Sequence, residues 1–65
     1  MCEANVFYKD GDELKKLMEA AFIITKEGDR VYFQNIFGEQ EFVKGKIKEM
    51  DLIKHEVIID KINDR

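Results

Sequence analysis

The residue with the clearest capacity for chemistry is Cys2, the single cysteine of this 65-residue chain, which opens MCEANV. Its thiol stands beside the terminal amine and a peptide amide that can be deprotonated. A nearby protonated amine lowers the pKa of a thiol, and the thiolate is the form that binds metals. A set of thiolate and nitrogen donors suits square-planar nickel(II) or copper(II), whereas zinc or cuprous ion prefers more sulfur or imidazole. The plain alternative is that Cys2 is a small apolar strand residue.

The nitrogen donors of such a site depend on Met1. If Met1 is retained, the terminal amine and the amide between Met1 and Cys2 are the candidates, and that amide forms a five-membered chelate ring with the sulfur. If Met1 is removed, the amine and the thiolate of Cys2 chelate the metal directly. Either way one chain does not complete four positions. A two-fold dimer with both N-termini at its axis would complete them, because an isologous interface brings each residue close to its own copy.

Other candidate ligands are weaker. His55, in LIKHEVI, is the only histidine. It stands at an expected hairpin turn, where we interpret it as solvated and leave it outside the main site. Glu3 and Asp60 could form a separate oxygen site. Because the chain carries 14 acidic residues, such pairs also arise by chance.

Length and charge limit the class of protein. A chain of this size buries only about 60% of its unfolded surface, so a partner subunit or a metal would help to stabilise it. The net charge of −3 gives no general attraction for phosphates, so nucleic-acid binding is not expected. No apolar run is long enough for a membrane helix, and the N-terminus lacks a secretory pattern. We therefore expect a cytoplasmic protein, where a lone thiol stays reduced.

The elements that must position Cys2 are predicted to be short strands. Residues 2–8 alternate, with Cys2, Ala4, Val6 and Tyr8 on one side. Further β-prone runs follow at 22–25, 31–36, 42–43, 47–53 and 57–59, the last with Ile62. Gly28 in KEGDR can supply the positive φ of a tight hairpin between the second and third runs. Five to six short strands in residues 1–65 predict a single all-β domain, a small SH3-like antiparallel barrel.

The segment DGDELKKLMEAAF is ambiguous. Leu14, Leu17 and Met18 fit one turn of an amphipathic helix, and the run is too short for periodicity to decide between helix and strand.

The main alternative to a metal site is a binding module that contacts RNA or a partner protein through the barrel face. Tyr32 and Phe33 with Arg30 are aromatic and basic residues of the kind that bind single strands. Lys44, Lys46 and Lys48 alternate along one strand, although lysines of this kind are commonly a device that protects an edge strand.

An enzyme is not expected. The chain has one cysteine, one histidine and no serine, so sets of nucleophile, base and orienting residue are nearly unavailable. A barrel of this size is filled by its own side chains.

Three segments together resemble the CooT family of small nickel-binding proteins: the opening MCEANV, the sequence NIFGEQ with its Phe37-Gly38 turn, and the tail GKIKEMDLIKHEVII. The similarity extends over essentially the whole chain. The resemblance implies a homodimeric SH3-like barrel that binds nickel(II) through Cys2, with Met1 as a further donor, and that supplies nickel for anaerobic carbon monoxide dehydrogenase. We therefore predict a nickel metallochaperone or nickel reservoir.

Overall fold

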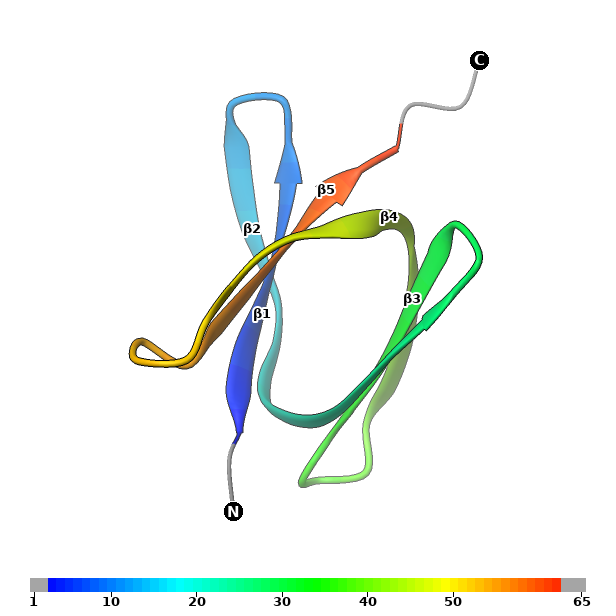
Figure 1. Ribbon diagram of the computed structural model, residues 1–65. Helices are drawn as coiled ribbons and strands as arrows, with labels where there is room; N and C mark the ends of the chain where they lie inside the picture. The colour runs from blue at the N-terminus through cyan, green and yellow to red at the C-terminus, as the bar shows by residue number, and fades with distance from the viewer. Residues whose placement is uncertain (1–2, 63–65) are drawn as a thin grey trace.

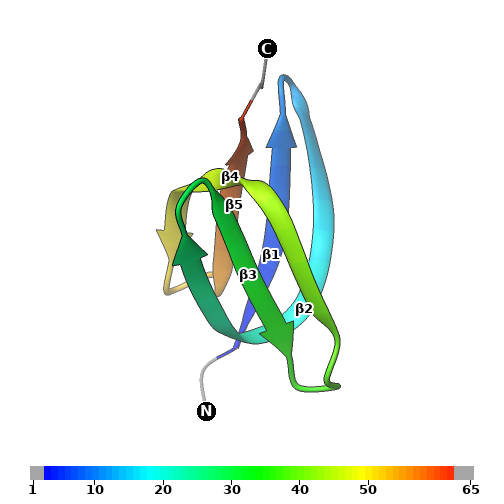
Figure 2. The same ribbon diagram turned by 90° about the vertical axis from the view of Figure 1, so that its right-hand side faces the viewer.

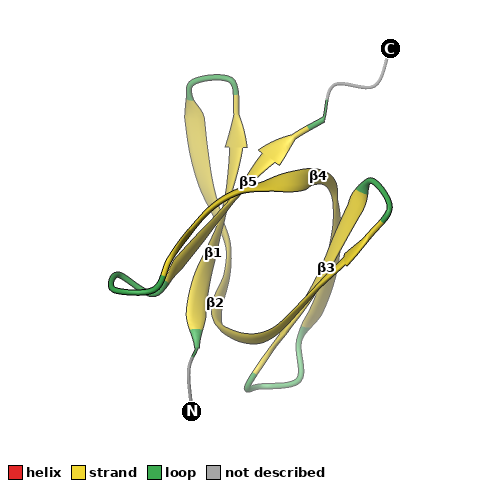
Figure 3. Ribbon diagram, in the orientation of Figure 1, coloured by secondary structure: helices red, strands yellow, loops and turns green. Residues whose placement is uncertain are grey.

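The computed structural model describes residues 3–62, which form five strands joined by turns and no helix (Figures 1 and 3). Within this range no helix is available to cross a membrane. The strands are β1 (Ala4–Asp10), β2 (Glu13–Glu27), β3 (Arg30–Asn35), β4 (Gln40–Asp51) and β5 (Glu56–Lys61). They close into a barrel in the order β1-β2-β3-β4-β5. The prediction of a small SH3-like all-β barrel is confirmed, with five strands.

Consecutive strands pair in antiparallel fashion, as expected, but the pair that closes the barrel is parallel. In this β1–β5 pair the register runs from Asn5 opposite Glu56 to Lys9 opposite Asp60. The first and last strands of the chain therefore lie side by side and point in the same direction (Figures 1 and 2).

The ambiguous segment belongs to β2, a single bent strand of 15 residues. Its first part pairs with β1 and its last part with β3, and Ala21 has a partner in both. The register shifts on both sides of this point, and Ala20 adopts a φ of 59°. An irregularity of this kind bends a strand sharply. It allows one strand to serve both halves of the barrel.

The strand β4 has the same double role. Residues up to Lys44 pair with β3, and residues from Gly45 onward pair with β5. A side chain at Gly45 would collide with the backbone oxygen of Asp60 and with Ile59, so glycine permits the close approach of β4 and β5. The hydroxyl of Tyr8 donates a hydrogen bond of 2.9 Å to the carbonyl oxygen of Lys44 at the same bend.

The core is small and apolar. Its buried members come from all strands except β4: Val6, Met18, Ala21, Val31, Phe33, Val57 and Ile59. Val6 is fully buried, and Ala4 and Tyr8 pack against the core, which confirms the predicted inward side of β1 over the described residues. The predicted hairpin turn is confirmed too, with a φ of 63° at Gly28.

The turn between β3 and β4 is organised by Asn35, the one buried polar residue among residues 3–62. Its Oδ1 accepts hydrogen bonds from the backbone N–H groups of Phe37 (3.0 Å) and Glu39 (2.9 Å). Its Nδ2 donates to Oε1 of Glu39 at 2.6 Å. A single side chain thus fixes a five-residue turn from within.

Replacing Asn35 by Ala should destabilise the protein by about 2–3 kcal/mol, because it removes three hydrogen bonds from a buried position. Urea unfolding followed by circular dichroism measures this change. The control Glu39→Gln keeps an oxygen acceptor for Asn35 and should cost less than about 1 kcal/mol. Equal losses in the two variants would contradict the assigned role of Asn35.

Candidate functional site

The two predicted site residues, Met1 and Cys2, lie outside the described residues. Glu3, which is bonded to Cys2, is the first residue that the structure describes. Strand β1 enters the barrel at Ala4. In both views this end of β1 lies on the side of the β3–β4 turn, away from the β1–β2 hairpin (Figures 1 and 2). We call this the N-terminal end of the barrel.

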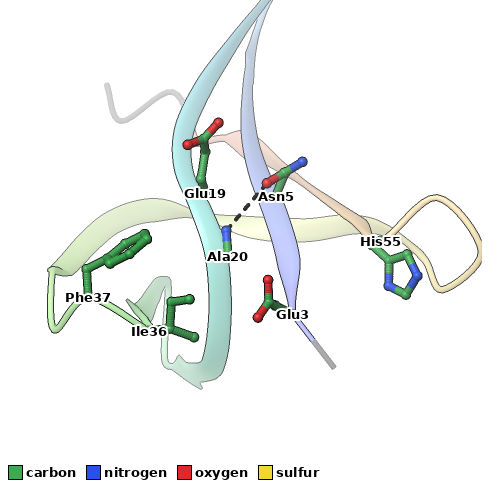
Figure 4. A pocket seen from close by; sticks show the side chains of 7 residues that line it. All are labelled: Glu3, Asn5, Glu19, Ala20, Ile36, Phe37 and His55. Atoms are coloured by element: carbon green, nitrogen blue, oxygen red, sulfur yellow. Dashed lines mark hydrogen bonds between the residues drawn. The ribbon is translucent and has the colours of Figure 1, made fainter. Parts of the chain in front are cut away.

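An open cavity of about 510 Å³ lies at the N-terminal end. Figure 4 shows Glu3 between the β3–β4 turn, which carries Ile36 and Phe37, and His55 on the other side. The bend of β2 is tied to β1 here, because the N–H of Ala20 donates to Oδ1 of Asn5 at 3.4 Å. The lining residues are Glu3, Asn5, Glu19, Ala20, Ile36, Phe37 and His55.

A second, more apolar cavity of about 260 Å³ lies beside the first. It is formed by the start of β1, the bend of β2 and the β4–β5 turn, and its apolar lining comprises Ala4, Ala21, Phe22, Ile24, Met50, Leu52 and Val57. Its polar lining comprises Glu3, Asp51, His55 and Glu56. Glu3 and His55 are the residues that line both cavities.

Large apolar side chains are exposed around these cavities. Phe37 is 73% exposed, Leu52 82% and the adjacent Ile53 90%. Phe22, Ile36 and Met50 are also exposed and line one cavity or the other. Contiguous exposed apolar surface is typical of a site that contacts another molecule.

The turn between β4 and β5 is held in place at both ends. Oδ1 of Asp51 accepts hydrogen bonds from the N–H groups of Ile53 (3.0 Å) and Lys54 (2.9 Å). The carbonyl oxygen of His55 accepts one from the N–H of Asn5 at 2.8 Å. His55 itself has a φ of 59°. This turn is therefore fastened to the start of β1.

Two carboxylates at this end are stabilised in the charged form. The backbone hydrogen bond from Lys54 is the main cause that lowers the pKa of Asp51. Desolvation opposes it, and the N–H of Ile53 and the charges of Lys54 and His55 add to the lowering. The pKa of Glu19 is lowered by the hydrogen bond and charge of Lys16, whose Nζ lies 2.6 Å from its carboxylate. Asp51 and Glu19 therefore keep their negative charge to a lower pH than carboxylates with unshifted pKa values.

The other predicted ligands are His55, Glu3 and Asp60. His55 lies in the predicted turn and is exposed. Glu3 precedes β1, whereas Asp60 pairs with Lys9 near the far end of that strand, so these two acids do not form a common site. Within residues 3–62 no three side chains of the types His, Cys, Asp and Glu come together to hold a metal.

The face predicted to contact RNA or a partner protein includes Tyr32, Phe33 and Arg30, and not all of these side chains reach the surface. Phe33 is fully buried. Tyr32 and Phe42 pack with ring centroids 5.1 Å apart, and the Arg30 guanidinium carbon lies 5.7 Å from the centroid of the Phe42 ring.

The edge-strand interpretation of the lysine row is wrong, because β4 pairs with β3 and β5 in a closed barrel. The register also shifts between Ile47 and Glu49, which breaks the alternation at Lys48.

Comparison with known proteins decides the family. The family model described as CO dehydrogenase accessory protein CooT matches residues 1–60. The chain belongs to the CooT family. The match covers Met1 and Cys2 and all of the barrel except Lys61, the last residue of β5. It links the chain to CO dehydrogenase in an accessory role.

A solved structure shares this CooT fold. The crystal structure of a protein assigned as CooT from Carboxydothermus hydrogenoformans superposes with a TM-score of 0.86 at 27% identity, covering 95% of this chain and 100% of the other. An uncharacterized protein of Methanocaldococcus jannaschii is 30% identical over 60 residues, 92% of this chain and 98% of that protein. An uncharacterized protein of Archaeoglobus fulgidus is 37% identical over 43 residues, 66% of this chain and 96% of that protein.

Sequence reasoning missed the exposed apolar residues of this CooT-family barrel. It placed Leu52 and Ile53 in a strand that ends at residue 53, whereas β4 ends at Asp51 and both side chains lie in the turn. The available signal was Asp51 itself, since aspartate commonly caps the amides two and three residues ahead of it.

The Asp51 cap should respond to acid in a defined direction. A carboxylate with a lowered pKa in the folded state stabilises the fold above its unfolded pKa, and this stabilisation is lost as the pH falls through the folded pKa. The amide proton resonances of Ile53 and Lys54 should therefore shift on acidification, with a midpoint below the ordinary aspartate value of 3.8. NMR spectra recorded across an acid titration measure this, and Asp51→Asn should abolish the transition. A midpoint at or above 3.8 would contradict the cap.

Proposed function

We propose that this protein is a nickel(II)-binding accessory protein that serves carbon monoxide dehydrogenase as a metallochaperone or nickel reservoir in the cytoplasm. The observation that carries the proposal is the family match, which begins at residue 1 and so includes the Met1-Cys2 donor pair. Nickel is here a cargo of the protein, and the enzyme is the partner to which it is delivered.

The chemistry of the donors supports nickel. The thiolate of Cys2 with an amine or amide nitrogen at Met1 or Cys2 favours a square-planar d⁸ ion. Copper(II) should bind such a set at least as tightly, because affinity rises from nickel to copper in the usual order of divalent metals. Selection of nickel therefore depends on metal supply in the cell as well as on the site.

A homodimer completes this proposal. One chain provides one thiolate and one or two terminal nitrogens, and a second copy related by a two-fold axis would double that set. The exposed Phe37, Leu52 and Ile53 all lie around Glu3 at the N-terminal end or in the adjoining turn. Burying these side chains between two copies would remove the apolar surface that the small barrel leaves in water. The two N-termini would then meet at the interface.

A second candidate function is a binding module for RNA or a partner protein, with Cys2 as an ordinary strand residue. The outward face formed by Arg30, Tyr32 and Phe42 favours it, since a guanidinium above an aromatic ring is a recognised contact surface for stacked ligands. Substitution of Cys2 distinguishes the two functions.

The nickel proposal predicts saturation at one nickel(II) for two chains. Untagged protein with its natural N-terminus is titrated with nickel(II), and thiolate-to-metal absorption and native mass are followed together. Cys2→Ser should lose tight binding and leave the unfolding transition unchanged. Equal binding by both proteins, or no binding by either, would refute a nickel site at Cys2 and favour the binding module.

The dimer prediction is tested with Leu52→Lys/Ile53→Lys. Each apolar side chain contributes about 2 kcal/mol when fully buried, so the double change should weaken self-association by on the order of 100-fold or more. Size-exclusion chromatography with light scattering gives the mass in solution. Leu14→Lys is the matched control, because Leu14 is 56% exposed but lies by the β1–β2 hairpin, opposite Lys9. An unchanged dimer in the double variant would exclude the N-terminal end as the interface.

A further inference from the structure

We propose that Phe37 of one copy of this chain inserts into the apolar cavity of a second copy, the cavity of about 260 Å³ formed by the start of β1, the bend of β2 and the β4–β5 turn. The contact is reciprocal, so each copy supplies one phenylalanine and one cavity. This inference rests on the proposed homodimer and names the contact that holds its two copies together.

Phe37 has the properties of an anchor. Its side chain is 73% exposed and stands in the β3–β4 turn beside Ile36, which is also exposed. The backbone beneath it is fixed, because the buried side chain of Asn35 accepts hydrogen bonds from the N–H groups of Phe37 and Glu39. An aromatic side chain on a fixed turn loses little conformational freedom when it binds, which favours its use as the centre of an interface.

The cavity has the size and the lining that an aromatic ring requires. Its volume is about 260 Å³, whereas an apolar cavity of about 150 Å³ is enough to hold benzene. Its walls include Ala21, Ile24, Met50 and Leu52. Leu52 is 82% exposed and Met50 51%, so a ring from a second copy would remove apolar surface of both partners from water.

The distribution of charge selects the β3–β4 turn as the segment that enters. The cavity carries three carboxylates in its polar lining: Glu3, Asp51 and Glu56. The β1–β2 and β2–β3 turns contain Asp12 and Asp29, so either of them would bring like charges together on entering. Residues 36–38 of the β3–β4 turn carry no charged side chain. This turn can therefore enter the cavity without placing an acid against an acid.

The positions of the phenylalanine and the cavity suit two-fold symmetry. Glu3 lies between Phe37 on one side and His55 of the β4–β5 turn on the other (Figure 4). A two-fold axis near Glu3 would place each of these turns on the opposite turn of the second copy, because an isologous interface is self-complementary. A standard interface covers roughly 800 Å² on each partner, about a sixth of the 4716 Å² surface of this chain. An interface centred near Glu3 would therefore extend over both turns.

The test combines a direct contact measurement with a matched pair of variants. Isotope-filtered NMR on a mixture of labelled and unlabelled unmodified protein should show contacts between the Phe37 ring of one copy and the methyl groups of Met50 and Leu52 of the other. Phe37→Ala removes two anchors from each dimer and should weaken self-association by about 100-fold or more, measured by analytical ultracentrifugation with and without nickel(II). Phe42→Ala is the control, because Phe42 is 55% exposed but lines neither cavity, and it should leave self-association unchanged.

The outcomes separate this inference from the proposed homodimer. A dimer in which Leu52 contacts its own copy, or in which the Phe37 ring shows no contact with the second copy, overturns the inference and leaves the homodimer standing. Equal weakening by Phe37→Ala and Phe42→Ala also overturns it, because the loss is then not specific to the anchor. A protein that is monomeric both with and without nickel(II) overturns the homodimer and this contact together.

Discussion

The structure depends on the bending of two long strands. In the closed barrel β2 pairs with β1 along its first part and with β3 along its last part, and β4 is divided in the same way between β3 and β5. The bend of β2 at Ala20 and Ala21 and the close approach at Gly45 in β4 make this possible. Without them β1 and β5 would remain the edges of an open sheet, with unpaired backbone groups exposed.

The same bends decide which surface is left for function. The interior is filled by seven buried apolar side chains, and the two cavities at the N-terminal end are open to solvent. A surface of this kind suits contact with another macromolecule and the exchange of a small ion, and it offers little enclosure for a substrate undergoing reaction. The accessory role of the CooT family is consistent with such a surface.

Much of the fold could be predicted from sequence because the signals were local. Gly28 marked its hairpin, β-branched and aromatic runs marked the strands, and the chain length favoured a small barrel. The bend of β2 could not be predicted: its buried residues Met18 and Ala21 are three positions apart, because an irregularity interrupts the alternation, and this spacing imitates a helix. The parallel closure of β1 on β5 is likewise a long-range property that no local pattern records.

The candidate site was predictable in its chemistry more than in its surroundings. A thiol beside a terminal amine is visible in MCEANV, and the family match includes it. The neighbourhood of His55 required the closing strand pair, since residues 3 and 55 are adjacent to one cavity only after the chain has folded. The exposed turn at Leu52 and Ile53 could not be recognised from sequence, because these two apolar residues continue the β-prone run that begins at residue 47.

The parallel contact between β1 and β5 also orders events during folding. It joins the two strands that are made first and last, and contacts of such wide sequence separation form late because the loop that they close is long. Antiparallel neighbours can pair earlier, but the β4–β5 turn reaches the start of β1 only once β5 has added to the barrel. The start of β1 therefore gains the β4–β5 turn as its neighbour only in the finished protein, and a partial chain on the ribosome carries Glu3 without Asp51 and Glu56 around the same cavity.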